Sequence, residues 1–579
     1  MPSAGELREI WAADTEFKPE GGVEGGKPFP LCLVARELRS GQVIRLWRDD
    51  LLRLPRAPFD TGPRSAMLAF FASAELGCFL SLGWPLPHNV LDLYVEHRWR
   101  NNGGRLTRRT ALIDVMRDQG LPFMAEIHKE AMRKKILEQH SYSADDRREI
   151  LNYCHEDTAA LDPLYHRSER WLDLPRALLR GRYVAACARV EWNGIPADTE
   201  WWERLVAHRE PILRRYVAEH DRPYGVYAGG LSWSDRRFLQ CLHRRGIPWR
   251  FHAKSKRPVL DEDFIGEMVR AHSELLGLQQ IRTTIKALQK PGLTIGIDGR
   301  NRVPVSPFGT ITGRNPPRAG KYLFGPARWM RSIIRPPPGW SLAYVDWVAQ
   351  EIAIAAVLSR DAVMRADYES GDPYLAFAMA TGLAPYGATK LTHKAIRDRI
   401  KVLFLASNYG MGATSFAAQA GISAPEAREL LELHRSRYRT YWGWLRRVVE
   451  RADLTSCIRT LLGWQMSVLD STRETTLQNW MMQAHGAELM RLAAIDLTEA
   501  GVRVCAIIHD AFLIEAPTDE LEAVVAFTER TMRRSGEELL GISIRTEHSL
   551  THHPDRFVDE KGGYDIWQQV SGWISEIDG

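Results

Sequence analysis

Two carboxylates in the second half of the chain stand where an apolar run ends. Asp346 closes the run SLAYVD, and Asp510 follows an apolar run in the segment IIHDAFLIEAP. Two carboxylates brought into one cleft repel each other unless cations neutralise them. Mg²⁺ takes oxygen ligands and needs only one or two protein carboxylates plus substrate phosphates. The two acids are therefore candidates for a two-metal site, although each taken alone is also explained as a turn or capping residue.

A stripe of basic, apolar and aromatic residues lies between these acids along the chain. In KAIRDRIKVLFLASNYGMG, Arg397, Lys401, Leu405 and Tyr409 recur every four positions. A step of four turns about 400° around an α-helix, so the four side chains share one face. The two cations could grip a triphosphate, Arg as a fork and Lys as a point charge. Leu405 and Tyr409 would then lie where a sugar and a base could stack, whereas a solvated basic helix explains the same spacing.

A second group of acids occupies the first half of the chain. Asp14 and Glu16 in IWAADTEF are two residues apart, which on a strand places them on one face. Asp92 follows in PHNVLDLY, and Tyr153 and Asp157 are four apart on an expected helix, hence neighbours. Clustered carboxylates again indicate a metal site, whereas an isolated Asp-x-Glu is more simply a surface pair.

The pattern of apolar residues predicts the elements that must position these side chains. Residues 1–165 alternate short apolar runs with helical stretches, which is typical of an α/β domain. Many turn formers between Gly292 and Trp340 indicate a loop-rich passage that approaches a ligand. Residues 341–465 begin as a strand and continue in long helices. A helix is expected over 475–500, and two strands around a tight turn over 502–516.

Composition is that of a folded soluble protein. The 579 residues suffice for several domains, with 45% hydrophobic and 26% charged residues. No stretch approaches the ~18 apolar residues of a membrane span, and the N-terminus lacks the apolar core of a secretory signal. Seven scattered cysteines without a CxxC pair indicate reduced thiols in a cytoplasmic protein, not a disulfide frame or zinc site. The net charge of +5 permits nucleic-acid binding without arguing for it.

The segments of the second half, in their order, resemble motifs A, B and C of the family A DNA polymerases, the bacterial DNA polymerase I group. Motif A of that family is an Asp followed five residues later by a Glu, motif B is Arg-x3-Lys-x7-Tyr-Gly, and motif C is an apolar run ending in His-Asp. A Thr-Gly-Arg template-primer motif precedes them, and an Asn and a Gln stand before motif C. The matching residues are Arg314, Asp346 and Glu351, then Arg397, Lys401, Tyr409 and Gly410, then Asn479, Gln483, His509 and Asp510.

The resemblance implies a role for each matched residue. Asp346 and Asp510 would hold two Mg²⁺ ions, with Mn²⁺ as a substitute, so that the primer 3′-hydroxyl attacks the α-phosphate of an incoming dNTP. Arg397 and Lys401 would bind the nucleotide phosphates, and Lys401 would also protonate the departing pyrophosphate. Glu351 would form part of the steric gate that excludes ribose.

The other matched residues would lie along the primer-template DNA. Tyr409 would stack near the nascent base pair, and Leu405 stands where the family mostly has Phe or Tyr. The residues implied to contact primer and template are Arg314, Asn479, Gln483 and His509. The chain departs from the family at Ala511, where a Glu usually follows the His-Asp pair.

The acids of the first half resemble the DEDDy 3′–5′ exonuclease domain that precedes the thumb of proofreading family A polymerases. The pattern of that domain is Asp-x-Glu, then Asn-x2–3-aromatic-Asp, then Tyr-x3-Asp. The matching residues are Asp14, Glu16, Asn89, Asp92, Tyr153 and Asp157, with Leu91 where an aromatic residue is usual. The resemblance implies two metal ions and a water, oriented by Tyr153, that attacks the terminal phosphodiester.

The expected fold class is a mixed α/β and α+β multidomain chain, with an RNase H-like exonuclease domain followed by a right-hand polymerase domain. The exonuclease domain is expected over residues 1–170 and the polymerase domain over 171–579. Within the latter the resemblance implies a thumb at about 200–300, a palm at about 301–360 and 465–579, and fingers at about 361–464.

The implied function is template-directed DNA synthesis with proofreading by a cytoplasmic monomer, with any helicase, clamp or single-strand-binding partner left open. The exonuclease domain starts almost at residue 1, which leaves no room for a 5′-nuclease domain and favours phage, prophage or plasmid replication over repair. Two alternatives are a nuclease whose polymerase-like half only binds DNA and a single-subunit RNA polymerase. The intact Asp346, Lys401 and Asp510 disfavour the first, and Glu351 together with the exonuclease motifs disfavours the second.

Overall fold

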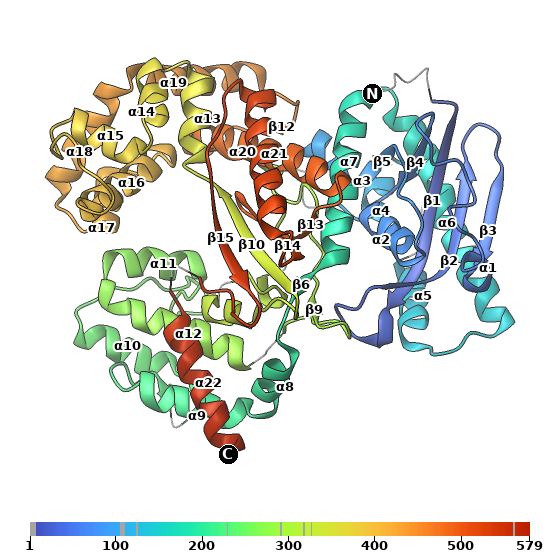
Figure 1. The fold of residues 1–579 in the computed structure, drawn as a ribbon, viewed down its shortest axis with the longest axis horizontal. Helices are drawn as coiled ribbons and strands as arrows, with labels where there is room; N and C mark the ends of the chain where they lie inside the picture. Colours follow the sequence, from blue (N-terminus) through green and yellow to red (C-terminus); the bar gives the residue numbers. More distant parts are fainter. Residues whose placement is uncertain are drawn as a thin grey trace.

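The chain folds around two large sheets that carry separate sets of helices (Figure 1). A computed structural model describes residues 7–104, 110–122, 126–228, 230–289, 292–316, 319–325, 327–559 and 562–579. None of the helices in these ranges is long and apolar enough to cross a membrane.

The N-terminal unit is a five-stranded sheet of order β3-β2-β1-β4-β5, in which β1 pairs antiparallel with β2 and parallel with β4. Its strands are β1 (Glu9–Pro19), β2 (Pro28–Glu37), β3 (Val43–Trp47), β4 (Ser65–Ala69) and β5 (Val90–Asp92). Its helices are α1 (Arg48–Leu51), α2 (Ser73–Ser81), α3 (Leu93–Asn101), α4 (Leu112–Asp118), α5 (Glu126–Glu138) and α6 (Ala144–Ser168). The run Ile10–Ala13 of β1 is buried, as expected for a central strand that is covered on both faces.

A long helix joins this unit to the rest of the molecule. Helix α7 (Leu174–Asn193) packs against α2 and β5 on one side and against α20 and β13 on the other. Gly181 allows the close approach, because a Cβ there would lie 1.8 Å from the carbonyl oxygen of Val90. The two halves of the chain therefore share a packed junction.

The second sheet has the order β13-β14-β10-β15 and lies at the centre of the molecule (Figure 1). Its strands are β10 (Trp340–Trp347), β13 (Arg503–Ile508), β14 (Ala511–Pro517) and β15 (Thr546–His552), and helices α20 (Glu474–Glu499) and α21 (Leu521–Leu540) pack beside it. The expected helix over 475–500 and the expected strand pair over 502–516 are confirmed. This sheet forms the region expected to be the palm.

Helices α13 to α19 form the upper left of Figure 1, in the region expected to be the fingers. They are α13 (Gln350–Ser359), α14 (Ala362–Glu369), α15 (Pro373–Ala380), α16 (Lys394–Asn408), α17 (Ala413–Ala420), α18 (Ala424–Arg437) and α19 (Arg439–Thr455). Asp361 caps the N-terminus of α14 and also accepts a hydrogen bond of 2.9 Å from the backbone N–H of Tyr441. This single carboxylate therefore ties the start of α14 to α19.

Helices α8 to α12 form the lower left of Figure 1, in the region expected to be the thumb. They are α8 (Thr199–Ala207), α9 (Arg209–His220), α10 (Asp235–Arg244), α11 (Glu262–Ala271) and α12 (Leu276–Gln289). The remaining strands form short pairs: β6 (Ile195–Pro196) with β9 (Arg300–Asn301), β7 (Tyr227–Ala228) with β8 (Ser232–Trp233), and β11 (Cys457–Arg459) with β12 (Gln465–Ser467).

The C-terminal helix α22 (Tyr564–Asp578) packs on the thumb helices, although it falls in the range 465–579 that was expected to be palm (Figure 1). The Trp567 ring stacks on the Trp201 ring of α8 with centroids 3.9 Å apart, and Asp578 pairs with Arg204 at 2.6 Å. Burial of the Trp567 ring against the Trp201 ring explains the docking.

Candidate active sites

Asp346, on β10, and Asp510, in the turn between β13 and β14, lie at the same end of the central sheet. Asp346 on β10 is directly opposite Ala511, the first residue of β14, and the Trp347 N–H donates to the Asp510 carbonyl oxygen at 3.3 Å. Asp510 and His509 form the turn between β13 and β14, and His509 adopts a left-handed φ of 54°, a conformation in which His is several-fold enriched. The fold therefore brings together two carboxylates that are far apart in sequence.

The charges of both carboxylates act on the same neighbouring groups. Burial raises the pKa of Tyr344, and the negative charges of Asp346 and Asp510 raise it further. Burial also raises the pKa of Glu351; the Arg314 guanidinium opposes this increase and Asp510 adds to it. Asp346, Asp510 and Glu351 thus form one region of negative potential, whose oxygen donors suit a hard divalent cation.

Glu351 and Tyr409 meet beside this region. The Asn408 side-chain amide donates to Glu351 Oε2 at 3.4 Å, and the Gln483 amide donates to the Tyr409 hydroxyl at 2.9 Å. The negative charge of Glu351 contributes to the raised pKa of Tyr409, after burial. The residues expected at the sugar gate and the nascent base pair therefore lie close together.

Helix α16 presents the expected stripe on one face. Lys401, Leu405 and Tyr409 are exposed, whereas Ile400 and Phe404 are buried in the packing of the helices around them. Arg397, the first residue of the stripe, is half-buried. Its guanidinium forms an ion pair with Asp372, the N-cap of α15, and lies 5.2 Å from the centroid of the Tyr374 ring.

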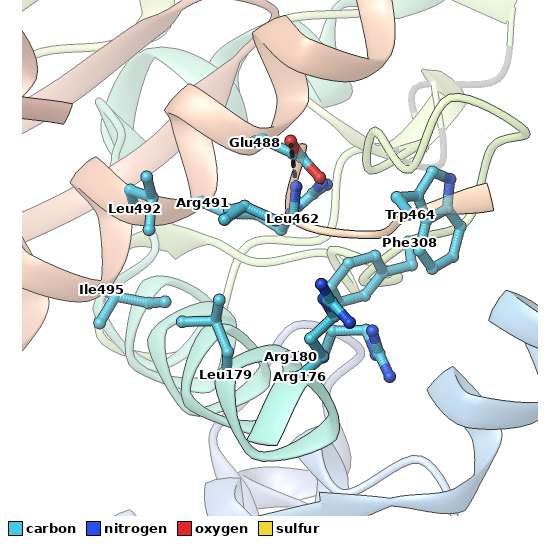
Figure 2. Close-up of a pocket in the computed structure, with 10 residues that line it drawn as sticks. All are labelled: Arg176, Leu179, Arg180, Phe308, Leu462, Trp464, Glu488, Arg491, Leu492 and Ile495. Carbon is cyan, nitrogen blue, oxygen red and sulfur yellow. Dashed lines mark hydrogen bonds and ion pairs between the residues drawn. The ribbon is translucent and has the colours of Figure 1, made fainter. Parts of the chain in front are cut away.

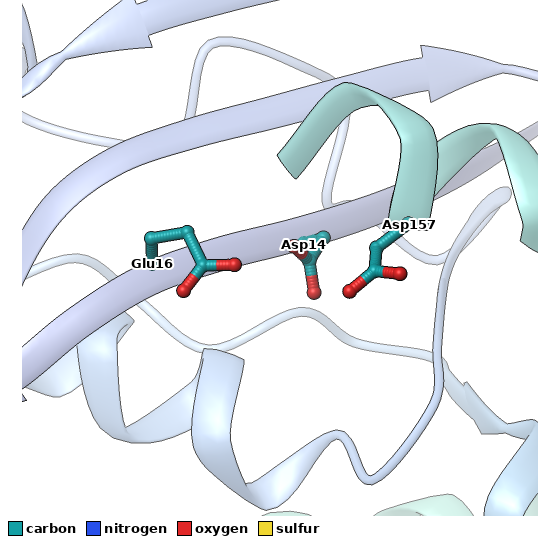
Figure 3. Close-up of side chains that lie close together, drawn as sticks. All are labelled: Asp14, Glu16 and Asp157. Carbon is teal, nitrogen blue, oxygen red and sulfur yellow. The ribbon is translucent and has the colours of Figure 1, made fainter. Parts of the chain in front are cut away.

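Three acids of the N-terminal unit converge on one point (Figure 3). Asp14 and Glu16 extend from β1 and Asp157 from α6, and one ligand oxygen from each lies within 4.8 Å of the other two. The Asp14 Oδ2 atom is buried and has no hydrogen-bond partner. A buried oxygen without a donor is costly, which fits a site that holds a metal ion.

The carboxyl groups of this cluster suppress one another's ionisation. Burial raises the pKa of Asp14 to about 7, and the negative charge of Asp157 adds to the increase. Burial and the charge of Asp14 raise the pKa of Glu16 well above its ordinary value. Tyr153, one turn before Asp157 on α6, has its pKa raised by burial and then by the charge of Asp157. Such mutual repulsion is the condition that a bound cation relieves.

Asp92, predicted to belong with these acids, lies outside the three-carboxylate group. Its Oδ1 atom accepts hydrogen bonds from the backbone N–H groups of Phe71 and Tyr94, both at 2.9 Å, and its Oδ2 atom accepts one from Ala72 at 3.0 Å. Asp92 caps α3 and fixes the start of α2. Asn89 likewise serves the backbone, donating to Pro63 and Ser65 carbonyls at 3.0 Å.

Glu75 on α2 is a further buried acid beside this group that the sequence analysis did not include. Only 4% of Glu75 is exposed, and its Oε2 atom is buried without a hydrogen-bond partner. Burial and then the negative charge of Asp14 raise its pKa well above the ordinary value. A signal was present in the sequence, because Glu75 is the only Asp, Glu, Lys or Arg between Arg64 and Asp92. A lone acid in an apolar helix is rarely buried without a function.

A cavity at the junction of the two halves is not a candidate for chemistry. It lies between α7 and α20, has a volume of about 20 Å³ and is lined partly by Arg180, Glu488 and Arg491 (Figure 2). That space holds about one water molecule. Arg180 forms a bidentate pair with Glu96 at 2.6 Å, and Glu488 accepts from the Leu462 N–H at 3.2 Å. These buried charges therefore serve the packing of the junction.

Comparison with known proteins agrees with this geometry. The profile of DNA polymerase family A matches residues 325–553. DNA polymerase I of Chloroflexus aurantiacus is 23% identical over 495 residues, which cover 80% of this chain and 48% of that protein. The thermostable DNA polymerase I of Thermus thermophilus is 28% identical over 209 residues, 34% of this chain and 25% of that protein. The DNA polymerase of Mycobacterium phage L5 is 27% identical over 207 residues, 35% of this chain and 33% of that protein.

A solved structure shares the fold over nearly the whole chain. The POL domain of Pol1 from M. smegmatis, in complex with DNA primer-template and dNTP, superimposes with a TM-score of 0.66 at 19% identity and covers 95% of this chain and 96% of that one. The chain itself spans between a quarter and about half of the two DNA polymerase I proteins named above. The matched segment contains Asp346, helix α16 and Asp510, so the part of the chain that carries these residues is similar to DNA polymerase family A.

Proposed function

We propose that the protein is a DNA-directed DNA polymerase that extends a primer on a template with dNTPs. The observation that carries the proposal is the pairing of β10 with the β13–β14 hairpin, which makes Asp346 and Asp510 neighbours. The M. smegmatis POL domain, which has the same fold, is complexed with DNA primer-template and dNTP, and this supports the same ligands for this chain.

Asp346 and Asp510 would hold two divalent ions, Mg²⁺ in the first instance. Their carboxylate oxygens are hard donors at one end of the central sheet, beside a third acid, Glu351, whose pKa is raised partly by Asp510. When bound, divalent ions at such a site activate the attacking hydroxyl and stabilise charge on the leaving group. The chain's own contribution is to hold the two carboxylates next to each other at one end of the central sheet.

The exposed stripe of α16 would receive the nucleotide. Lys401 offers a mobile ammonium for the β- and γ-phosphates and a proton for the departing pyrophosphate. Arg397 is paired with Asp372 on α15, and the triphosphate would compete with that carboxylate for the guanidinium. Leu405 and Tyr409, both exposed on the same face, would pack against the sugar and the base.

Residues around this stripe would contact the primer and template strands. The Gln483 amide already donates to the Tyr409 hydroxyl, and the positive charge of Arg314 opposes the rise in the pKa of Glu351. His509 stands at the exposed turn beside Asp510. Contacts from these side chains to sugar and phosphate suit an enzyme that copies any sequence.

We further propose that the N-terminal unit is a 3′–5′ exonuclease that removes misincorporated nucleotides. Asp14, Glu16 and Asp157 would hold the divalent ions, with Glu75 as the fourth acid in place of Asp92. Tyr153, with its pKa raised far above the ordinary value, stays protonated and can orient the attacking water as a hydrogen-bond donor. Similarity to the DNA polymerase of Mycobacterium phage L5 supports a role in phage or prophage replication.

The test of the polymerase proposal is primer extension by the wild-type chain with dNTPs and, separately, with rNTPs. We expect extension with dNTPs only, because the family resemblance assigns Glu351 to the steric gate, where its half-buried side chain would exclude a 2′-hydroxyl. Glu351→Ala should admit rNTPs at least about tenfold better relative to dNTPs. Extension with rNTPs only would show that the protein is an RNA polymerase. Extension with neither nucleotide would favour the alternative of a nuclease whose polymerase-like half only binds DNA.

Metal binding to the N-terminal cluster is expected to strengthen as the pH rises towards neutrality. Asp14 has a pKa of about 7 in the folded chain, so protons compete with Mn²⁺ below that pH, and affinity should rise by up to about tenfold per pH unit below pH 7. In EDTA the same group should lower the stability of the folded chain progressively as the pH rises from about 4 to about 7, and the loss should persist above about pH 7. The reason is that the unfolded chain releases this proton at a lower pH than the folded chain does.

The measurement is a Mn²⁺ titration between about pH 5.5 and about pH 8. Asp346→Asn/Asp510→Asn protein removes the carboxylates of the other site, so that only the N-terminal cluster binds. Affinity that does not change over this range would contradict the raised pKa of Asp14.

A further inference from the structure

A lysine lies inside the acid cluster of the N-terminal unit. Lys129 on α5 places its Nζ atom 3.0 Å from Oδ2 and 3.3 Å from Oδ1 of Asp157. The Lys129 side chain is 35% exposed and that of Asp157 is 15% exposed. The ammonium therefore hydrogen-bonds both oxygens of Asp157, which also belongs to the three-acid group.

The charge of Lys129 reaches the other acids of the group. Its positive charge lowers the pKa of both Asp14 and Glu16, against the burial that raises them. In the part of the chain that the structure describes, Lys129 is the one basic side chain among the main contributions to the pKa values of these two acids. Lys129 therefore partly neutralises the cluster before any metal ion arrives.

A purely structural ion pair between α5 and α6 is already supplied elsewhere. Lys135, six residues further along α5, pairs with Asp146 and Glu149 of α6, each at 2.6 Å. That pair lies outside the cluster and fastens the same two helices. Docking of α5 on α6 therefore does not require the ion pair between Lys129 and Asp157.

We propose that Lys129 is the resident counter-cation of the cluster and that a divalent ion binds by displacing it from Asp157. The inference deepens the proposed exonuclease function and rests on the metal-binding part of it. Lysine carries its charge on a flexible, partly exposed stem, so the ammonium can leave Asp157 without moving α5. Metal binding is then an exchange of cations, and it is weaker than it would be with a neutral residue at position 129.

The experiment compares Lys129→Met with Lys135→Met in full-length Asp346→Asn/Asp510→Asn protein, where only the N-terminal cluster binds metal. Removing the competing charge should tighten Mn²⁺ binding about tenfold. Lys129→Met should also melt at a lower temperature in EDTA and gain more stability from Mn²⁺ than the parent. Lys135→Met removes a paired lysine from the same helix and should leave Mn²⁺ affinity unchanged, and Lys129→Arg should behave like the parent.

The possible outcomes distinguish failure of the proposed cation exchange from failure of the proposed metal site. If Mn²⁺ binds and the binding is lost in Asp14→Asn, but Lys129→Met binds Mn²⁺ no more tightly than the parent, the exchange is overturned and the metal site stands. If no Mn²⁺ binding depends on Asp14, both are overturned. If Lys135→Met tightens binding as much as Lys129→Met, the effect is one of overall charge, and the exchange is again overturned.

Discussion

Asp510→Asn is expected to lower primer extension about 1000-fold or more, while the rate of 3′–5′ degradation stays within about twofold of wild type. Asn has nearly the shape of Asp and is tolerated in tight turns, so the turn between β13 and β14 persists. The change removes one negative charge from the site that we propose holds two divalent ions. Asp346→Asn should have the same effect, since Asp346 is paired with Ala511, the residue next to Asp510.

The measurement is single-turnover extension of a labelled primer, with degradation of the same primer followed in the absence of dNTPs. Asp519→Asn is a matched control, because Asp519 is an exposed acid just beyond the other end of β14; it should extend primers like wild type. Equal loss of extension and degradation in Asp510→Asn would contradict two separate metal sites, and unchanged extension would remove Asp510 from the reaction.

Glu75→Gln is expected to lower the exonuclease rate about 100- to 1000-fold and to leave primer extension unchanged. The substitution keeps the shape of a side chain that is only 4% exposed, and removes a charge that interacts with Asp14. Because burial disfavours the ionised carboxylate, Glu75→Gln should also melt at the same or a higher temperature in EDTA. Loss of activity would then not be attributable to unfolding.

Asp92→Asn tests the alternative in which Asp92, and not Glu75, is the fourth acid of the exonuclease site. Asp92 accepts backbone hydrogen bonds at the start of α2 and of α3, so its replacement should cost about 1–3 kcal/mol of stability. The folded fraction should retain exonuclease activity to within about tenfold, since Asp92 holds the loop that positions Glu75 and would not touch the metal. The measurement is degradation of a 3′-labelled strand with melting curves beside it. If Asp92→Asn strongly lowers the exonuclease activity and Glu75→Gln leaves it unchanged, the fourth acid is Asp92.

Local features of both sites could be predicted from the sequence because they depend on short spacings. The four-residue recurrence of Lys401, Leu405 and Tyr409 places them on one face of any α-helix, and the structure has them exposed together on α16. The two-residue spacing of Asp14 and Glu16 places them on one face of any strand, and both now face Asp157 (Figure 3).

Contacts between distant segments were decided only by the tertiary structure, because spacing carries no information about strand register or helix docking. The choice between Asp92 and Glu75 depends on how α2 leaves β4, and Asp92 proves to be occupied by backbone N–H groups. The placement of Lys129 on Asp157 depends on how α5 docks on α6. The adjacency of Asp346 and Asp510 requires the register between β10 and β14, which packing of the whole sheet sets and no single segment encodes.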